Sequence, residues 1–168
     1  NGHMVRILDS LSCQVHGDIP SQLEWIDEHG IDFIRGSVLN KELLLNSLSD
    51  IDTIIHLAAE TGTGQSMYRI EHYNQANSQA TAILMDLLAN SNNLQIHRVI
   101  LASSRSVYGE GAYRSPDPNI TQRIFPDSRP LSDLQNHKWD PICLSTNLPL
   151  IAQATKEDDK VSPGSIYA

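Results

Sequence analysis

The sequence predicts an α/β fold in which a parallel sheet is joined by crossover helices. Short apolar, β-branched segments alternate, along residues 1–109, with segments whose apolar residues recur every three or four positions. This alternation is typical of parallel sheets, because parallel strands need a long crossover connection. The last apolar segment, Val99–Leu101, ends in a run of hydroxyl residues, and ligands bind at the carboxyl ends of such strands.

The first predicted strand covers residues 5–8 and ends at Asp9. An acidic residue at the end of a strand in a dinucleotide-binding fold accepts hydrogen bonds from ribose hydroxyls, although a lone Asp there is also a common turn residue. Residues 1–4 are either a remnant of cloning or the end of a helix, because Gly is frequent just after a helix.

The following elements continue the alternation. They are a polar loop over 10–20, a helix over 21–30 with Trp25 as a packing residue, a strand over 31–36, a helix over 40–48 capped by Asn40, and a buried strand over 51–59. The last strand ends in the small residues Ala58 and Ala59, which let a flat ligand approach the backbone. His56 within it is expected to be a packed strand residue rather than a catalyst.

Residues 66–90 have the periodicity of one long helix. Asn77 lies among its apolar residues, and a buried amide needs hydrogen-bond partners. Asn77 therefore either braces a neighbouring strand or is a satisfied structural amide. The strand 99–101 then leads into Ser103, Ser104, Ser106 and Tyr108-Gly109, where the serines either serve a site or merely end the strand.

Residues 110–163 lack a long periodicity and contain seven of the eight prolines. The stretch is too long for an ordinary loop, so we expect a surface-exposed, partly irregular insertion. Its larger apolar residues are expected to form a small cluster: Trp139, Ile142, Leu148, Leu150 and Ile151.

The composition excludes several classes of partner. A net charge of −8 argues against nucleic acid or an anionic membrane surface. No apolar run approaches the roughly 18 residues of a membrane span. Two distant cysteines, Cys13 and Cys143, provide neither a disulfide framework nor a closed zinc site, which favours a reducing cytoplasm.

Five motifs, in this order, resemble the extended short-chain dehydrogenase/reductase superfamily, and within it the NAD-dependent epimerases and dehydratases of nucleotide sugars. They are Asp9 after its strand, HLAA at 56–59, Asn77 in a long helix, ASSRSVYG at 102–109 and SIYA at 165–168. The resemblance covers nearly the whole chain except the insertion. It implies a Rossmann-type sheet, bound NAD and a nucleotide-sugar substrate.

The resemblance also implies roles for individual residues. Ser104 would hydrogen-bond the reacting oxygen of the substrate, and Tyr167 would be the acid/base of a YxxxK motif, whose Lys favours the phenolate. The implied NAD-binding residues are Asp9, Ser37, Val38, Leu57, Ala58, Ala59, Asn77 and Ser103. The implied substrate residues are Thr61, Gly62, Thr63, Ser104, Arg105 and Ser106, and no metal is expected.

Two family features do not occur in these 168 residues: a first strand with a GxxGxxG turn, and the Lys of the YxxxK motif. We therefore expect a chain truncated at both ends that lacks the first βα unit. Its expected parts are an incomplete NAD-binding core over 1–109, the insertion over 110–163, and the start of the helix that carries Tyr167 over 164–168.

The sequence departs from the family at three places. Gly36-Ser37 stands where Gly-Asp usually meets the adenine, so that contact would use the backbone of Val38. Arg105-Ser106 replaces the Asp-Glu of 4,6-dehydratases, which argues against dehydration. The insertion is framed by GEGAYR at 109–114, followed later by Trp-Asp-Pro at 139–141 and an acidic stretch before SIYA. This frame resembles that of dTDP-rhamnose-type 4-epimerases, in which paired cysteines are frequent, but only Cys143 is present in the insertion.

These features favour an NAD-dependent 4-epimerase of a nucleotide-linked sugar. Two alternatives stay open: a non-catalytic dinucleotide-binding fragment, and a net reductase or dehydrogenase of the same superfamily. The helix over 66–90 resembles one that pairs two subunits in family dimers, but packing on its own sheet explains its periodicity equally well.

Overall fold

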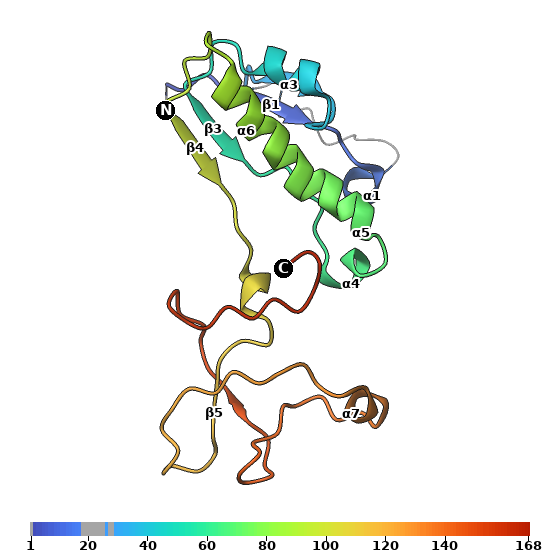
Figure 1. The fold of residues 1–168 in the computed structure, drawn as a ribbon, viewed down its shortest axis with the longest axis vertical. Helices are drawn as coiled ribbons and strands as arrows, with labels where there is room; N and C mark the ends of the chain where they lie inside the picture. The colour runs from blue at the N-terminus through green and yellow to red at the C-terminus, as the bar shows by residue number, and fades with distance from the viewer. Residues whose placement is uncertain (1, 18–25, 27–28) are drawn as a thin grey trace. The chain divides into compact units, whose positions relative to one another are not determined.

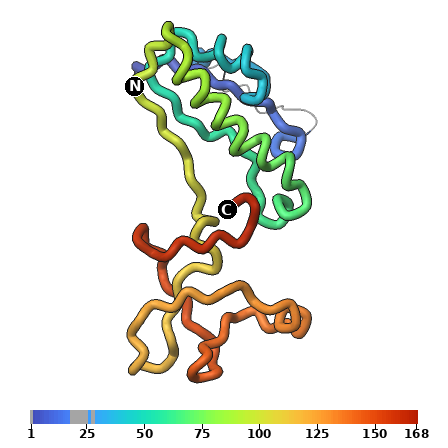
Figure 2. The backbone as a smooth tube through the Cα atoms, viewed as in Figure 1, coloured from blue at the N-terminus to red at the C-terminus, as the bar shows by residue number. Residues whose placement is uncertain are grey.

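The computed structural model describes residues 2–17, 26 and 29–168, and the chain divides into two compact units (Figure 1 and Figure 2). The first unit comprises residues 1–61 and 69–102, and the second comprises residues 62–68 and 103–168. The helix predicted over 21–30, including Trp25, falls mostly outside the described residues.

The first unit contains the predicted alternation of strands and helices. Its elements are β1 (Arg6–Asp9), α1 (Cys13–His16), β2 (Asp32–Arg35), α3 (Lys41–Ser47), β3 (Thr53–His56), α5 (Ile70–Tyr73), a π-helix (Asn74–Gln79), α6 (Ala80–Asn90) and β4 (Arg98–Leu101). β1 pairs with β2, and β3 pairs with β4, both in parallel. The predicted α/β class is confirmed, whereas α1 lies in a stretch predicted as a loop.

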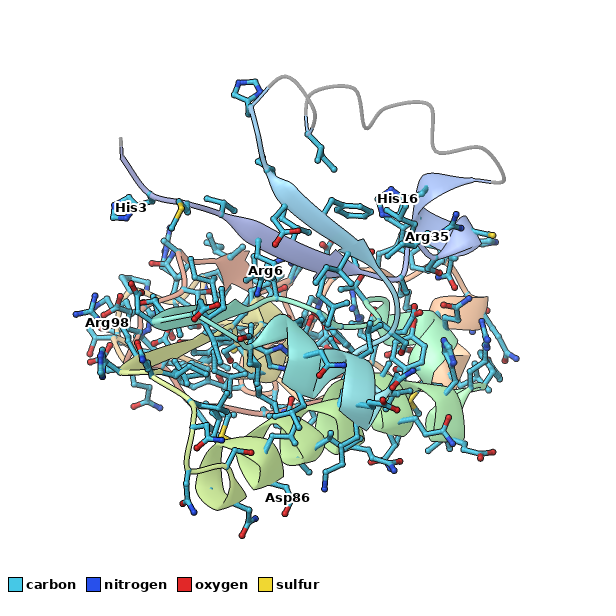
Figure 3. The ribbon with its side chains drawn as sticks, turned by 90° about the horizontal axis from the view of Figure 1, so that it is seen from above. His3, Arg6, His16, Arg35, Asp86 and Arg98 are labelled. Carbon is cyan, nitrogen blue, oxygen red and sulfur yellow. The ribbon has the colours of Figure 1, made fainter. Side chains whose placement is uncertain are left out.

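The core of the first unit lies between α3, α6 and the strands. Leu44 of α3 and Leu48, just after this helix, pack against Leu84 and Leu87 of α6, and all four are at most 5% exposed. Partly buried apolar residues complete the cluster: Leu8 of β1, Ile54 of β3, Ile83 and Leu88 of α6, and Leu94 and Ile96 between α6 and β4. Figure 3 shows α3 and α6 on the same side of the strands.

Both ends of α3 are capped by side chains. At its start, the Asn40 side chain accepts a hydrogen bond from the Leu43 N–H at 3.0 Å, as predicted. At its end, the Arg6 guanidinium donates to the carbonyls of Ser47 and Ser49 at 3.0 and 2.8 Å and pairs with Asp32 on β2. Because a cation favours a helix C-terminus, Arg6 joins β1 and β2 to this helix (Figure 3).

The prediction that the strands over 51–59 and 99–101 are buried is wrong for one face of the sheet. Ile55 is 61% exposed, Ile100 47% and Leu101 57%. Successive side chains of a strand point to opposite faces, so Ile54 faces the helices while Ile55 faces away from them. In the described residues, helices cover only the first of these faces.

The prediction of one continuous helix over 66–90 is also wrong. α4 (Thr63–Ser66) ends before a turn, and helical structure resumes at Ile70 and continues to Asn90 through the π-helix. The spacing of Met67 and Ile70 suggested continuity, yet both are about half exposed and lie outside the core. Among the described residues, no helix is long and apolar enough to cross a membrane.

The second unit is built from short elements joined by irregular chain. They are α4, a 3₁₀ helix (Arg105–Tyr108), β5 (Tyr113–Arg114), α7 (Leu131–Gln135) and β6 (Ile151–Ala152). β5 pairs antiparallel with β6, and Tyr113 also exchanges backbone hydrogen bonds with Ile124 at 2.8 and 2.9 Å. β5 therefore has partners on both of its edges.

Polar as well as apolar residues are buried in the second unit, and the predicted apolar cluster is wrong. Of its five members only Leu150 is buried, whereas Trp139 is 58% exposed and Leu148 53%. The buried residues instead include Ser115, Cys143 and Asp159. Side-chain hydrogen bonds therefore hold this unit together beside a few buried apolar residues such as Ala112 and Leu150.

One ion pair fastens two distant parts of the second unit. The Arg123 guanidinium donates to both carboxylate oxygens of Asp159, at 2.8 and 2.5 Å, and to the carbonyl of Ala154 at 2.8 Å. The Lys156 N–H also donates to this carboxylate, at 2.7 Å. Arg123 is the main reason that the pKa of Asp159 lies below its usual value of 3.8.

Asp159→Asn is expected to destabilise the second unit at neutral pH, because an amide cannot form the ion pair with Arg123. A lowered pKa in the folded state gives stability that is fully present above the unfolded value and lost as the pH falls through the folded value. The difference in urea midpoint between wild type and variant should therefore shrink below about pH 4. Asp158→Asn, at the exposed neighbouring position, is the control, and an equal effect of the two changes would contradict the assignment.

Candidate functional site

The end of β1 presents a carboxylate that is partly fixed in place. The Leu11 N–H donates to Oδ1 of Asp9 at 2.7 Å, and the Asp9 residue is exposed. Asp9 stands opposite Arg35 in the parallel pairing, so Ser37 and Val38 follow β2 at the same edge of the sheet. The Ser37 hydroxyl accepts from the Leu39 N–H at 3.2 Å. These three predicted NAD-binding residues thus gather at one edge.

The segment that follows β3 is fastened by the amide of Asn77. Its Oδ1 accepts from the Glu60 N–H at 2.8 Å, and its Nδ2 donates to the Glu60 carbonyl at 3.0 Å. Of the two possibilities for Asn77, the structure therefore has it bracing the chain beyond a strand. Leu57, Ala58 and Ala59 lie in the stretch between β3 and this brace.

Two more side chains of the same helix hold this segment. The Tyr73 hydroxyl donates to the carbonyl of Thr61 at 3.0 Å, and Tyr73 is 1% exposed. His72 Nε2 lies 3.2 Å from a carboxylate oxygen of Glu60. Sequence reasoning missed these residues, although a Tyr four positions before Asn77 lies on the same helix face.

His56 connects β3 to the same helix. Its Nε2 lies 3.1 Å from the Thr81 hydroxyl, which donates to the Asn77 carbonyl at 2.7 Å. Since the hydroxyl has one hydrogen, His56 must donate to it, so the hydrogen of the neutral ring lies on Nε2. Burial lowers the pKa of His56, which favours this neutral form.

The predicted catalytic serine begins the 3₁₀ helix of the second unit. The Ser104 hydroxyl oxygen accepts from the Ser106 N–H at 3.1 Å, as an N-cap does. Its own hydrogen is engaged by no residue in the part of the chain that the structure describes. Ser103 and Arg105, on either side, are exposed. Ser104 is therefore held in place and able to donate.

The glycine that ends the VYG motif is required by its surroundings. Gly109 has φ +61°, and a Cβ there would lie 2.2 Å from the carbonyl oxygen of Ser162. The Ser162 N–H donates to the Val107 carbonyl at 2.8 Å. The motif therefore contacts the chain five residues before Tyr167, and any side chain at Gly109 would push this chain away.

Tyr167 belongs to the same unit as Ser104, Gly62 and Thr63. Its backbone N–H donates to the hydroxyl of Ser66 at 3.1 Å. Ser103, Arg105 and Ser106 also belong to this second unit, whereas the predicted site residues up to Thr61, and Asn77, belong to the first. Ser66 is fully buried, and it was not a candidate in the sequence because it falls on the apolar face of the predicted helix.

The two cysteines are free thiols, Cys13 exposed and Cys143 buried. Hydroxyl groups around Cys143, chiefly those of Ser145, Thr146 and Ser115, lower its pKa to about 6. Within the described residues, no group of three or more His, Cys, Asp or Glu side chains has the arrangement of a metal site.

Asn77→Ala should lower the free energy of unfolding by about 1–3 kcal/mol, because both backbone groups of Glu60 lose their partner. Hydrogen exchange of residues 57–61 should accelerate with it. Asn74→Ala is the matched control, since Asn74 lies in the same π-helix and is exposed. If the two variants lose the same stability, the brace does not hold the segment.

Comparison with known proteins gives the family. The model of the NAD dependent epimerase/dehydratase family matches residues 1–132. The dTDP-L-rhamnose 4-epimerase of Burkholderia thailandensis is 39% identical over 163 residues, which are 96% of this chain and 42% of that protein.

Solved structures confirm the Rossmann-type fold. The dTDP-glucose 4,6-dehydratase DesIV of Streptomyces venezuelae, with NAD and TYD bound, has a TM-score of 0.60 at 21% identity, over 98% of this chain and 37% of its own. The UDP-glucose 4-epimerase of Brucella ovis, in complex with NAD, has a TM-score of 0.56 at 21% identity, over 99% and 36%. The chain spans less than half the length of each of these relatives. On the strength of the family match, the chain belongs to the NAD dependent epimerase/dehydratase family, whose cofactor is NAD.

Proposed function

We propose that the full-length protein containing these residues is an NAD-dependent 4-epimerase of a nucleotide-linked sugar. The observation that carries the proposal is the 39% identity, over 96% of this chain, with a dTDP-L-rhamnose 4-epimerase. Epimerases and dehydratases share the fold, so the sequence rather than the architecture selects the reaction.

The residues after Ser104 support epimerisation over dehydration. Removing water from a sugar needs an acid and a base beside the substrate. Arg105 and Ser106 stand where the dehydratases carry Asp-Glu. An arginine stays protonated and a serine hydroxyl is a weak acid, so this pair supplies neither group.

The described residues fit the adenosine part of NAD. Asp9 offers an exposed carboxylate whose orientation is fixed through Leu11, which suits the two hydroxyls of a ribose. Ser37 and Val38 lie at the same sheet edge for the adenine. The small residues Ala58 and Ala59 leave the backbone after β3 open to a flat ring. The GxxGxxG turn for the pyrophosphate is not among these 168 residues.

In the proposed reaction, Tyr167 and Ser104 handle the oxygen at C4 of the sugar. NAD, when bound, would supply the acceptor and donor of the C4 hydride, so the reaction would involve no net oxidation. The phenolate of Tyr167 takes the proton of the C4 hydroxyl and later gives it back. The Ser104 hydroxyl donates a hydrogen bond to the same oxygen, while Thr61, Gly62 and Thr63 lie along the sugar and Ser103 contacts the cofactor.

We further propose that the 168 residues alone are inactive. They contain neither the Lys that assists Tyr167 nor the phosphate-binding turn. β1 and β3 lie in separate two-stranded sheets although Leu8 and Ile54 contact one core, which supports a further strand between them in the full-length protein.

Pairing of two subunits through the helix over 70–90 and a cytoplasmic location are further parts of this proposal.

Incubation of the full-length protein with dTDP- and UDP-sugars should give isomers of unchanged mass without net formation of NADH. Chromatography with mass detection and NADH absorbance measure these two quantities. Net NADH production would instead identify a dehydrogenase. A product lighter by the mass of one water molecule would identify a dehydratase. The 168 residues alone should convert none of these sugars.

Tyr167→Phe should lower kcat by roughly 10²- to 10⁴-fold, because the phenol is the proposed acid/base. KM should change much less, since the ring itself remains. Tyr113→Phe is the control, because Tyr113 lies on β5 and has no proposed part in the reaction. Activity of Tyr167→Phe within a few-fold of wild type would remove Tyr167 from the mechanism.

A further inference from the structure

Ser66 makes two hydrogen bonds that join separate parts of the second unit. Its hydroxyl donates to the carbonyl of Thr63 at 2.7 Å and accepts from the backbone N–H of Tyr167 at 3.1 Å. The residue is 0% exposed. A hydroxyl in such a position is costly unless it is fully bonded, and here its one hydrogen and an acceptor site are both used. Figure 1 shows the C-terminal end of the chain beside α4.

The bonding of the last residues is that of a helix about to begin. The Ala168 N–H donates to the hydroxyl of Ser165 at 3.1 Å, which is the bond from N3 to an N-cap side chain. Residues 164–168 form no complete helical turn. In this register Tyr167 is at N2, where a backbone N–H has no partner within the helix. Ser66 supplies the missing acceptor from outside.

We infer that Ser66 is a positioning residue for Tyr167: its hydroxyl fixes the backbone N–H of Tyr167 and so sets where the phenol lies. The inference rests on the proposed role of Tyr167 as acid/base. The first turn of a helix frays easily, and the Ser165 cap holds only the N–H of Ala168. A misplacement of about 1 Å at a catalytic group can cost about 100-fold in rate. Through Thr63, the same hydroxyl joins Tyr167 to the segment proposed to lie along the sugar.

The test compares Ser66→Ala and Ser66→Cys with Ser47→Ala in the full-length protein. Ser47 is also buried, and its hydroxyl also donates to the carbonyl three residues earlier, at 2.7 Å, but it lies in α3 and has no proposed role. Ser66→Ala removes the hydroxyl and leaves a small space, whereas Ser66→Cys fills that space with a slightly larger sulfur that is only a weak hydrogen-bond acceptor. An effect shared by both variants therefore reports the lost hydrogen bond rather than a change in packing.

Hydrogen exchange of the Tyr167 amide is measured first, because it needs no activity. It should accelerate at least about tenfold in both Ser66 variants and stay unchanged in Ser47→Ala. In turnover with the sugar nucleotide that wild type epimerises, kcat should fall roughly 10- to 100-fold in both Ser66 variants with little change in KM.

Unchanged exchange of the Tyr167 amide would overturn the inference, and so would a kcat of Ser66→Cys within twofold of wild type. A wild-type protein that epimerises no nucleotide sugar would contradict the proposed function instead, whatever the exchange result. The two failures are therefore distinguishable.

Discussion

The structure depends on how the chain is held where it leaves β3. Beyond His56 no strand of the described residues pairs with the backbone, yet its N–H and C=O groups still need partners. Asn77 supplies both partners for Glu60, and Tyr73 supplies one for Thr61. Asn77 lies in a π-helical stretch, and such stretches are frequent at functional sites. Side chains of one helical segment thus supply the hydrogen bonds that a neighbouring strand would otherwise make. They fix the backbone of Glu60 and Thr61, which follows the predicted NAD contacts Leu57, Ala58 and Ala59.

The second unit uses the same kind of bond in place of a large apolar core. Serine hydroxyls accept from backbone N–H groups at Ser104, Ser115 and Ser165, and each bond holds a turn or a helix start. The bidentate ion pair of Arg123 with Asp159 joins two segments of this unit that are 36 residues apart in the sequence. Local side-chain to backbone bonds of this type compete well where proline prevents regular structure. They explain how a stretch with seven prolines becomes compact while residues such as Trp139 stay exposed.

The sequence predicts the order and type of the elements well because periodicity and capping act locally. The strand that ends at Asp9 and the helix capped by Asn40 need only neighbouring residues to be recognised. Burial is different, because the three apolar residues of β4 cannot reveal that helices cover one face only, as the exposed Ile100 illustrates. The break after Ser66 is equally hidden, since the hydroxyl that matters there binds a residue about 100 positions later. The motifs predict roles for Ser104 and Tyr167, whereas only the folded structure shows that Ser66 binds Tyr167.

The seven residues from Glu60 to Ser66 run from the first unit into the second, and each end is held by a different partner. Asn77 fixes the backbone of Glu60, and the hydroxyl of Ser66 binds the backbone of Tyr167. Between them Gly62 has φ +136°, a conformation open in practice only to glycine. A side chain there would strain the path between the two fixed points. Gly62 therefore serves the path of the chain between these two bonds, and the residues proposed to contact the sugar lie on the same short stretch of sequence.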